Sequence, residues 1–232
     1  MSLPQLNTPT YSLSLPSTGQ EIQYRPFLVK EQKLLLLANE SENIKESNVA
    51  IMKIIDNCTF GKLDVNNLPT FDVEYLFIKL RSKSVGETVN VTITCPDDKK
   101  TKDVVKVNLN DIDVNMTENH SNKINITDNI QLIMRYPLIT DIDTDIKTDI
   151  EGPFKVLKNC IESINDGEKV HTKADYTDKE LDDFLNAFNT DQLTKVMDFF
   201  NTMPKLRHPV KVKNKNTGIE SEVVIEGLES FL

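Results

Sequence analysis

A run of carboxylates between residues 141 and 149 is the first group that could do chemistry, because calcium prefers oxygen ligands of this kind. It consists of Asp141, Asp143, Asp145 and Asp149. An EF-hand loop that starts at the first of these needs a glycine at its sixth position and a bidentate glutamate at its twelfth. Those positions hold Ile146 and Gly152. We therefore interpret the run as a solvated acidic linker and expect no stoichiometric calcium, with calcium binding as the alternative.

The three cysteines could hold a metal or act as nucleophiles only with partners nearby. Cys95 opens a Cys-Pro-Asp-Asp turn that resembles half of a zinc knuckle, but structural zinc takes four nitrogen or sulfur ligands. No second cysteine lies near it in sequence, and the histidines are scattered at positions 120, 171 and 208. Cys58 and Cys160 fall on apolar helical stripes, where cysteine behaves as a small hydrophobe. We expect reduced structural cysteines, no zinc and no other cofactor.

Motifs that signal catalysis are absent from the sequence. It contains no Gly-x-Ser-x-Gly elbow, no His-Glu-x-x-His motif and no glycine-rich phosphate loop. If the protein were an enzyme with an unmarked site, the first candidates would be Arg25, Asp72, Glu74 and Arg81. Their alternative roles are helix capping and surface pairing. We expect that the protein is not an enzyme and that it works by binding other proteins.

The charge balance limits the classes of partner. Lys and Arg total 27 against 36 Asp and Glu, which gives a net charge of −9 and a pI near 4.9. Such a chain binds a phosphate backbone poorly unless its basic residues gather on one face. The densest basic cluster, residues 205–215, has no aromatic residues interleaved, so we expect no nucleic-acid binding. The longest apolar run, residues 34–38, is too short to span a membrane, and residues 1–5 lack a leader pattern.

Elements that could position these residues follow in a regular order in the first half. Alternating residues at 11–15 and 22–24, with a Pro-Ser-Thr-Gly turn between them, predict a hairpin. Helix-forming residues follow at 30–40, and a second helix has its apolar stripe at Ile51, Ile54, Ile55 and Cys58. A third helix is predicted from its cap at Thr70 to Gly86, and a second hairpin covers 89–109.

The second half repeats this order. Residues 124–134 read as extended, and an apolar stripe at Leu157, Cys160, Ile161 and Ile164 predicts a helix. A capping box of Thr177 and Glu180 opens another helix, and a further stripe covers 193–200. Residues 210–212 and 223–225 form a last hairpin around an Asn-Thr-Gly turn.

The fold class predicted from this order is α+β, with β-hairpins and interspersed helices. Each half has an extended segment, a proline stop, a helix carrying Asn-Cys, a further helix and a hairpin. We interpret this as a diverged tandem duplication of residues 10–115 and 120–232, with chance alternation as the alternative. The corresponding domains are residues 1–116 and 117–232, which could also pack as one domain. Residues 118–122 are predicted to be an exposed connection.

Three stretches resemble the baseplate hub proteins of contractile-tailed bacteriophages of the T-even type. They are Leu-Pro-Ser-Thr-Gly at 15–19 with Tyr-Arg-Pro-Phe-Leu-Val-Lys-Glu at 24–31, Phe-Asp-Val-Glu-Tyr-Leu-Phe at 71–77 with Leu-Arg-Ser-Lys-Ser-Val-Gly-Glu at 80–87, and residues 199–208 with 226–231. The resemblance implies a non-enzymatic role in hub assembly, as an assembly factor or chaperone, or alternatively as a stoichiometric hub subunit. It brings no catalytic residues with it. It places the protein in the host cytoplasm during assembly and leaves the virion baseplate open as a later location.

The segment 204–209 is the candidate contact with a partner, because it carries basic side chains between two prolines in an acidic chain. The residues chosen are Lys205 and Arg207, together with Phe231 and Leu232 at the terminus. The expected partner is an acidic surface of another hub protein or of a tape-measure protein. The alternative is a plain connector whose charges stay solvated.

Overall fold

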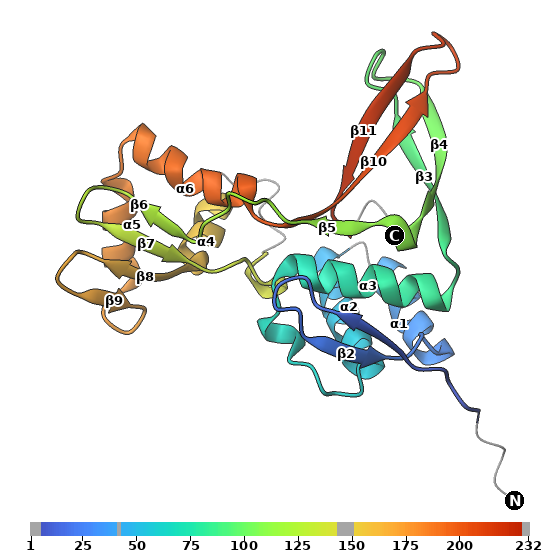
Figure 1. Ribbon diagram of the computed structural model, residues 1–232, viewed down its shortest axis with the longest axis horizontal. Coiled ribbons are helices and arrows are strands. Elements are labelled where there is room, and N and C mark those ends of the chain that lie inside the picture. Colours follow the sequence, from blue (N-terminus) through green and yellow to red (C-terminus); the bar gives the residue numbers. More distant parts are fainter. Residues whose placement is uncertain (1–5, 41–42, 143–150, 229–232) are drawn as a thin grey trace, which may run out of the picture. The chain divides into compact units, whose positions relative to one another are not determined.

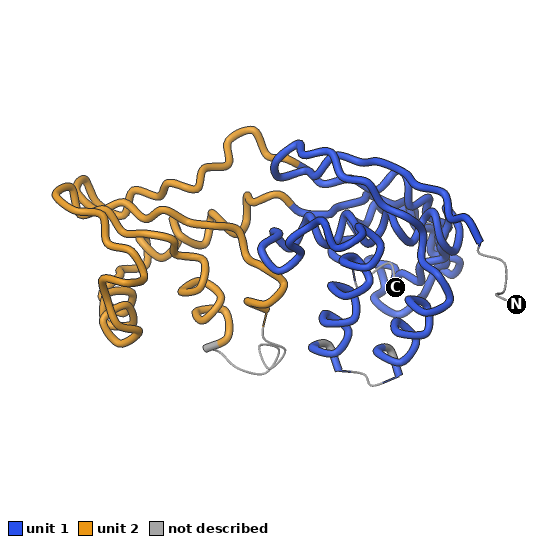
Figure 2. The backbone as a smooth tube through the Cα atoms, turned by 90° about the horizontal axis from the view of Figure 1, so that it is seen from below, with its two compact units in different colours: residues 1–115, 205–232 blue, residues 116–204 orange. Residues whose placement is uncertain are grey.

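The computed structural model describes residues 6–40, 43–142 and 151–228. Within these ranges it has six α-helices and eleven strands in small antiparallel sheets, which confirms the predicted α+β class (Figure 1). Figure 2 shows two compact units: unit 1 comprises residues 1–115 and 205–232, and unit 2 comprises residues 116–204. The division into residues 1–116 and 117–232 stays a prediction. The structure adds that residues 205–228 pack with the first unit, because strand pairing joins them to it.

Three helices form the core of unit 1: α1 (Val29–Glu40), α2 (Ile44–Cys58) and α3 (Thr70–Ser84). The predicted apolar stripe of α2 is confirmed, since its four members are at most 2% exposed. α3 is buried on most of its surface, so its hydrophobic residues pack on several sides. Two short 3₁₀ helices also belong to unit 1. η1 (Val65–Asn67) lies between α2 and α3, and η2 (Leu109–Asp111) lies further along the chain after α3.

The predicted first hairpin is present in unit 1 as β1 (Tyr11–Ser14) and β2 (Glu21–Tyr24). Gly19 closes its turn with a φ of 69°, a left-handed conformation that favours glycine. The turn is attached to α3, because the backbone N–H and the hydroxyl of Ser17 both donate to the Asp72 carboxylate.

Two further hairpins of unit 1 come from opposite ends of the chain. The first contains β3 (Thr88–Thr94) and β4 (Lys102–Asn108), and the second contains β10 (Lys205–Lys213) and β11 (Glu220–Glu226). The start of β10 also pairs with β5 (Asp113–Asn115), which gives the sheet order β11-β10-β5. Both predicted hairpins are therefore present, and the last segment of the chain returns to unit 1.

In its described residues, unit 2 has a four-stranded antiparallel sheet and three α-helices. The strands are β6 (Lys123–Asn125), β7 (Gln131–Met134), β8 (Ile161–Asn165) and β9 (Val170–Thr172), in the order β6-β7-β8-β9. The helices are α4 (Glu151–Cys160), α5 (Asp178–Asn186) and α6 (Thr190–Thr202), with a 3₁₀ turn η3 (Ile139–Asp141) before α4. One apolar cluster joins them, centred on Leu132, Met134, Cys160, Ile161 and Val196.

Two local predictions were wrong. The stripe at 157–164 is not one helix: α4 ends at Cys160, and Ile161–Asn165 is strand β8, paired with β7. Short apolar runs fit both periodicities, and the β-branched Ile161 and Ile164 suit the strand. The predicted cap at Thr70 is also wrong, since Pro69 occupies the N-cap position and makes no side-chain cap bond. By contrast, the capping box of Thr177 and Glu180 is confirmed.

Candidate functional site

Asp141 and Cys95, two of the residues singled out for metal chemistry, have structural contacts. Asp141 forms an ion pair with Arg135 at 2.6 Å, and positions 143, 145 and 149 lie outside the described residues. Cys95 is 1% exposed and lies at the end of β3, where its backbone N–H donates to the carbonyl of Thr101. In the described ranges, no three His, Cys, Asp or Glu side chains gather where they could hold a metal ion.

The two helical cysteines are fully buried. Cys58 and Cys160 are both 0% exposed. Burial raises the pKa of the Cys58 thiol to about 11 and that of the Cys160 thiol to about 12. Thiols with such pKa values are protonated at neutral pH, and a protonated thiol is a poor nucleophile. Both side chains therefore contribute to packing.

Arg25 belongs to an interaction that we call the first arginine clasp. Its guanidinium donates to the carboxylate of Glu31 at 3.0 Å and to the carbonyl of Pro26 at 2.9 Å. The same carboxylate accepts the backbone N–H of Leu28 at 2.9 Å, and the backbone N–H of Arg25 donates to the carbonyl of Cys58 at 3.0 Å. The clasp thus ties the end of β2 to the start of α1 and the end of α2.

A second arginine clasp with the same contacts is present in unit 2. Arg135 donates to Asp141 and to the carbonyl of Tyr136, and Asp141 accepts the backbone N–H of Leu138 at 2.8 Å. The backbone N–H of Arg135 donates to the carbonyl of Cys160 at 2.8 Å. The spacing of arginine, leucine and carboxylate is the same in both clasps, and sequence reasoning missed this repeated signal.

Of the remaining residues considered for catalysis, Asp72 and Glu74 have structural partners, and Arg81 is partly buried. Asp72 is 0% exposed and accepts two hydrogen bonds from Ser17. A carboxylate oxygen of Glu74 accepts the backbone N–H of Leu228 at 3.4 Å. Burial lowers the pKa of Arg81. Asp72 and Glu74 thus attach the first turn and the C-terminal strand end to α3, which are structural tasks.

The most distinctive surface of unit 1 is the pair of hairpins β3–β4 and β10–β11, which we call the arm. In Figure 1 the arm extends away from the helices of the same unit. Its inward side chains are apolar, among them Ile93 and Val107 on one hairpin and Val210, Val212 and Ile225 on the other, and all five are under 9% exposed. Strands β4 and β10 are neighbours, so β3 and β11 form the outer edges of the arm.

A polar network joins the tips of the two hairpins. The side-chain amide of Asn214 donates to both carboxylate oxygens of Asp97 at 2.9 Å, and the Thr217 hydroxyl donates to the same carboxylate at 2.6 Å. The backbone N–H of Lys213 donates to Asp103 at 3.1 Å. Asn214 is 1% exposed, so its hydrogen bonds are shielded from water. The two hairpins of the arm are therefore joined by hydrogen bonds between residues more than 100 positions apart in the sequence.

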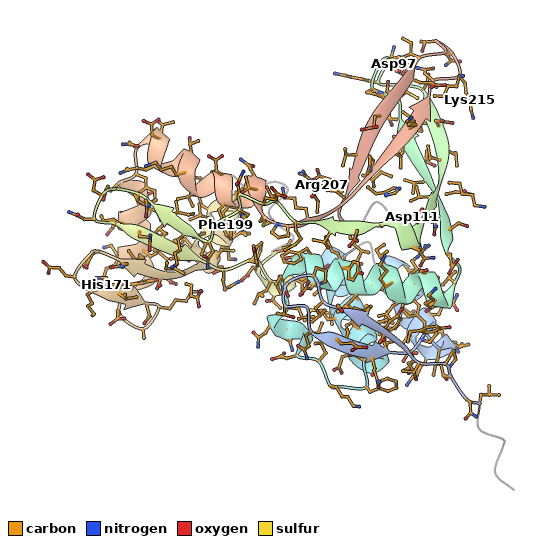
Figure 3. All side chains as sticks on the ribbon, viewed as in Figure 1. Asp97, Asp111, His171, Phe199, Arg207 and Lys215 are labelled. Carbon is orange, nitrogen blue, oxygen red and sulfur yellow. The ribbon has the colours of Figure 1, made fainter. Side chains whose placement is uncertain are left out.

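The aspartates of the arm are used internally, whereas its lysines are exposed. Asp98 accepts the backbone N–H groups of Lys100 and Thr101, and hydrogen bonds lower the pKa values of Asp97, Asp98 and Asp103. The exposed lysines of the arm are Lys99, Lys100, Lys102, Lys106, Lys211, Lys213 and Lys215. Figure 3 labels Asp97 and Lys215 near the far end of the arm.

The predicted contact residues lie at the base of the arm. Lys205 and Arg207 are both in β10, where they pair with Asn115 and Asp113 of β5 and are partly buried. The Nε of Arg207 lies 2.9 Å from a carboxylate oxygen of Glu226 on β11, so its charge is balanced within the arm. Phe231 and Leu232 lie outside the described residues. The segment 204–209, for which a plain connector was the alternative interpretation, is mostly strand.

Comparison with known protein families gives a match over almost the whole chain. A family model described as T4 bacteriophage base plate protein matches residues 8–232. No curated protein and no solved structure matches the chain. Within the described ranges, no helix is both long enough and apolar enough to cross a membrane. Because the family match covers almost the whole chain, the protein belongs to the T4 bacteriophage base plate protein family.

Proposed function

We propose that this baseplate protein acts in assembly of the baseplate hub, through protein–protein contacts and without catalysing a reaction. The observation that carries the proposal is the arm, whose hairpins are joined at their tips and present exposed lysines on an otherwise acidic chain. A structured, locally basic projection suits the recognition of an acidic partner, because charge contrast governs partner choice and association rate.

Loss of the gene product tests this proposal directly. A phage with an amber mutation in the gene should accumulate hub proteins that fail to form complete hubs, and a plasmid copy should restore assembly. Gradient sedimentation with electron microscopy measures this outcome. Normal hubs in the absence of the protein would contradict a role in hub assembly.

The second candidate function is a permanent hub subunit, and exposed apolar residues on α1 favour it. Leu36 and Leu37 are 56% and 65% exposed, and Val29 at the start of the same helix is 68% exposed. Apolar side chains in one region of a surface are typical of lasting interfaces. Quantitative mass spectrometry of purified virions separates the two candidates. A subunit is present at constant stoichiometry, whereas an assembly factor is absent from the particle.

The base of the arm is the proposed contact with an acidic surface of a hub or tape-measure partner. Lys205→Glu should reduce hub assembly by about tenfold without changing thermal stability, since it reverses a charge on a partly exposed side chain. Arg207→Glu alone is a poor test because it would face Glu226. The matched variant is therefore the exchange Arg207→Glu with Glu226→Arg, which keeps the ion pair and moves the charges. Normal assembly by both variants would leave this segment as part of the scaffold only.

A further inference from the structure

One edge of the arm has backbone groups directed away from its own sheet. The N–H of Cys95 donates to Thr101 at one end of the β3–β4 ladder, and the N–H of Leu109 donates to Glu87 at the other. With the observed register, the odd-numbered residues of β3 therefore bond to β4. The even-numbered residues direct their N–H and C=O groups to the open side: Thr88, Asn90, Thr92 and Thr94. In the described part of the chain, β3 pairs with β4 alone.

This edge lacks the features that usually prevent strand addition. Natural edge strands are protected by charges, prolines or bulges. β3 has the sequence Thr-Val-Asn-Val-Thr-Ile-Thr, with no charge and no proline, and its register with β4 is regular over seven residues. The other outer edge, β11, carries Glu220, Glu222 and Glu226. The two edges of the arm thus differ, and β3 is the one suited to pair with another strand.

The charges beside β3 indicate which segment would fit. Thr92 faces the exposed Val104 across the ladder, and the exposed Lys102 and Lys106 lie two residues to either side of that valine on the same face. The aspartates of this hairpin are already engaged in the tip network and its turn. The face beside the edge is therefore an apolar residue flanked by two positive charges.

We propose that β3 accepts an extended acidic segment of a partner protein as an added strand, with carboxylates on both sides of an apolar residue. Backbone hydrogen bonds to Asn90, Thr92 and Thr94 hold the segment, and the two lysines select its charge. This inference rests on the proposed function, because it identifies the kind of partner that the arm recognises. Pairing of two copies through β3 is disfavoured, since it places four lysines on one joined sheet.

Photo-crosslinking in infected cells tests the proposal. A photoreactive amino acid at position 92 should crosslink to an acidic, extended segment of another phage protein, identified by peptide sequencing. Asn90→Pro in the same chain should reduce the crosslink at least tenfold, because it removes an outward donor and leaves the β3–β4 ladder complete. Val224→Pro is the matched control on the β11 edge and should leave the crosslink unchanged. Thermal unfolding of both variants establishes that they are folded.

A second pair of variants tests the charge without altering the backbone. Lys102→Glu with Lys106→Glu should also reduce the crosslink at least tenfold, whereas Lys33→Glu with Lys53→Glu, on exposed positions of α1 and α2, should not. A crosslink from position 92 that is absent, insensitive to Asn90→Pro, or formed with a second copy or a helical segment overturns the proposal. Crosslinking is read independently of hub formation. A specific crosslink with normal hubs in the amber mutant would thus refute the proposed function and retain this inference.

Discussion

The two arginine clasps make the same set of contacts in surroundings of different exposure. The side chains of Arg25 and Glu31 are 10% and 0% exposed, whereas those of Arg135 and Asp141 are 29% and 9% exposed. Water can therefore reach the second arginine more easily than the first. Removing one partner of an ion pair costs more stability where water cannot reach the remaining charge, because that charge is then left without solvation. Equivalent geometry thus does not imply an equivalent contribution to stability.

The matched clasps are a local feature in favour of the proposed duplication. In both clasps, a leucine follows the arginine by three residues and the carboxylate follows it by six. In both, the backbone carbonyl of a buried cysteine at a helix end accepts the backbone N–H of the arginine. The elements after the cysteine differ, because α2 is followed by a turn and α4 by strand β8. The likeness between the two halves is therefore confined to the clasps and the elements that they join.

The largest effect is expected from Glu31→Ala. This change leaves Arg25 buried without its carboxylate and removes the acceptor of the Leu28 N–H, so we expect a loss of about 3–5 kcal/mol. Chemical denaturation measures it. Lys30→Ala is the matched control, because Lys30 also contacts Glu31 but is 66% exposed and should cost below about 1 kcal/mol. Equal losses in the two variants would contradict the role assigned to the first clasp.

A smaller effect is expected from Asp141→Ala in unit 2. Arg135 is partly hydrated, so the loss should be about 1–3 kcal/mol and below that of Glu31→Ala. The same denaturation experiment, followed by hydrogen exchange of the amides of each unit, measures the difference. A loss as large as that of Glu31→Ala would contradict this expectation, because side-chain exposure would then not govern how much stability a clasp contributes.

Sequence reasoning predicted the elements that local patterns determine and missed those that depend on distant contacts. The stripe of α2 and the capping box at Thr177 are local, and both were predicted. Arg25 was singled out, but its partner Glu31 was missed. Both hairpins of the arm were predicted, but their joining was not, because the bond from Lys213 to Asp103 connects residues 110 positions apart. The connection at 118–122 was predicted to be exposed, and four of its five residues are, but His120 packs into unit 2.

His120 gives unit 2 a pH-sensitive feature outside its clasp. Its ring lies 5.5 Å from that of Tyr136 and 4.9 Å from that of Phe199. Its Nδ1 lies 3.0 Å from the hydroxyl oxygen of Thr202, and that hydroxyl donates to the carbonyl of Asp198 at 2.7 Å. Because its hydrogen is already donated, the Thr202 hydroxyl oxygen can only accept a hydrogen bond from His120. The proton of the neutral His120 ring is therefore on Nδ1. The other nitrogen, Nε2, is buried without a hydrogen-bond partner.

The smallest predicted effect follows from this arrangement. Burial lowers the pKa of His120 from its ordinary value of 6.5, because a proton on Nε2 would have no partner. The neutral ring is therefore favoured in the folded state. Its stabilising contribution is fully present above pH 6.5 and is lost as the pH falls below that value towards the lowered pKa.

His120→Phe removes the titrating group and retains an aromatic ring, so its free energy of unfolding should fall less than that of the wild type between pH 7 and pH 5. Denaturation at several pH values measures this difference, in which the other titrating groups cancel. Parallel pH profiles for the two proteins would show that His120 takes up its proton equally well in the folded and unfolded chains.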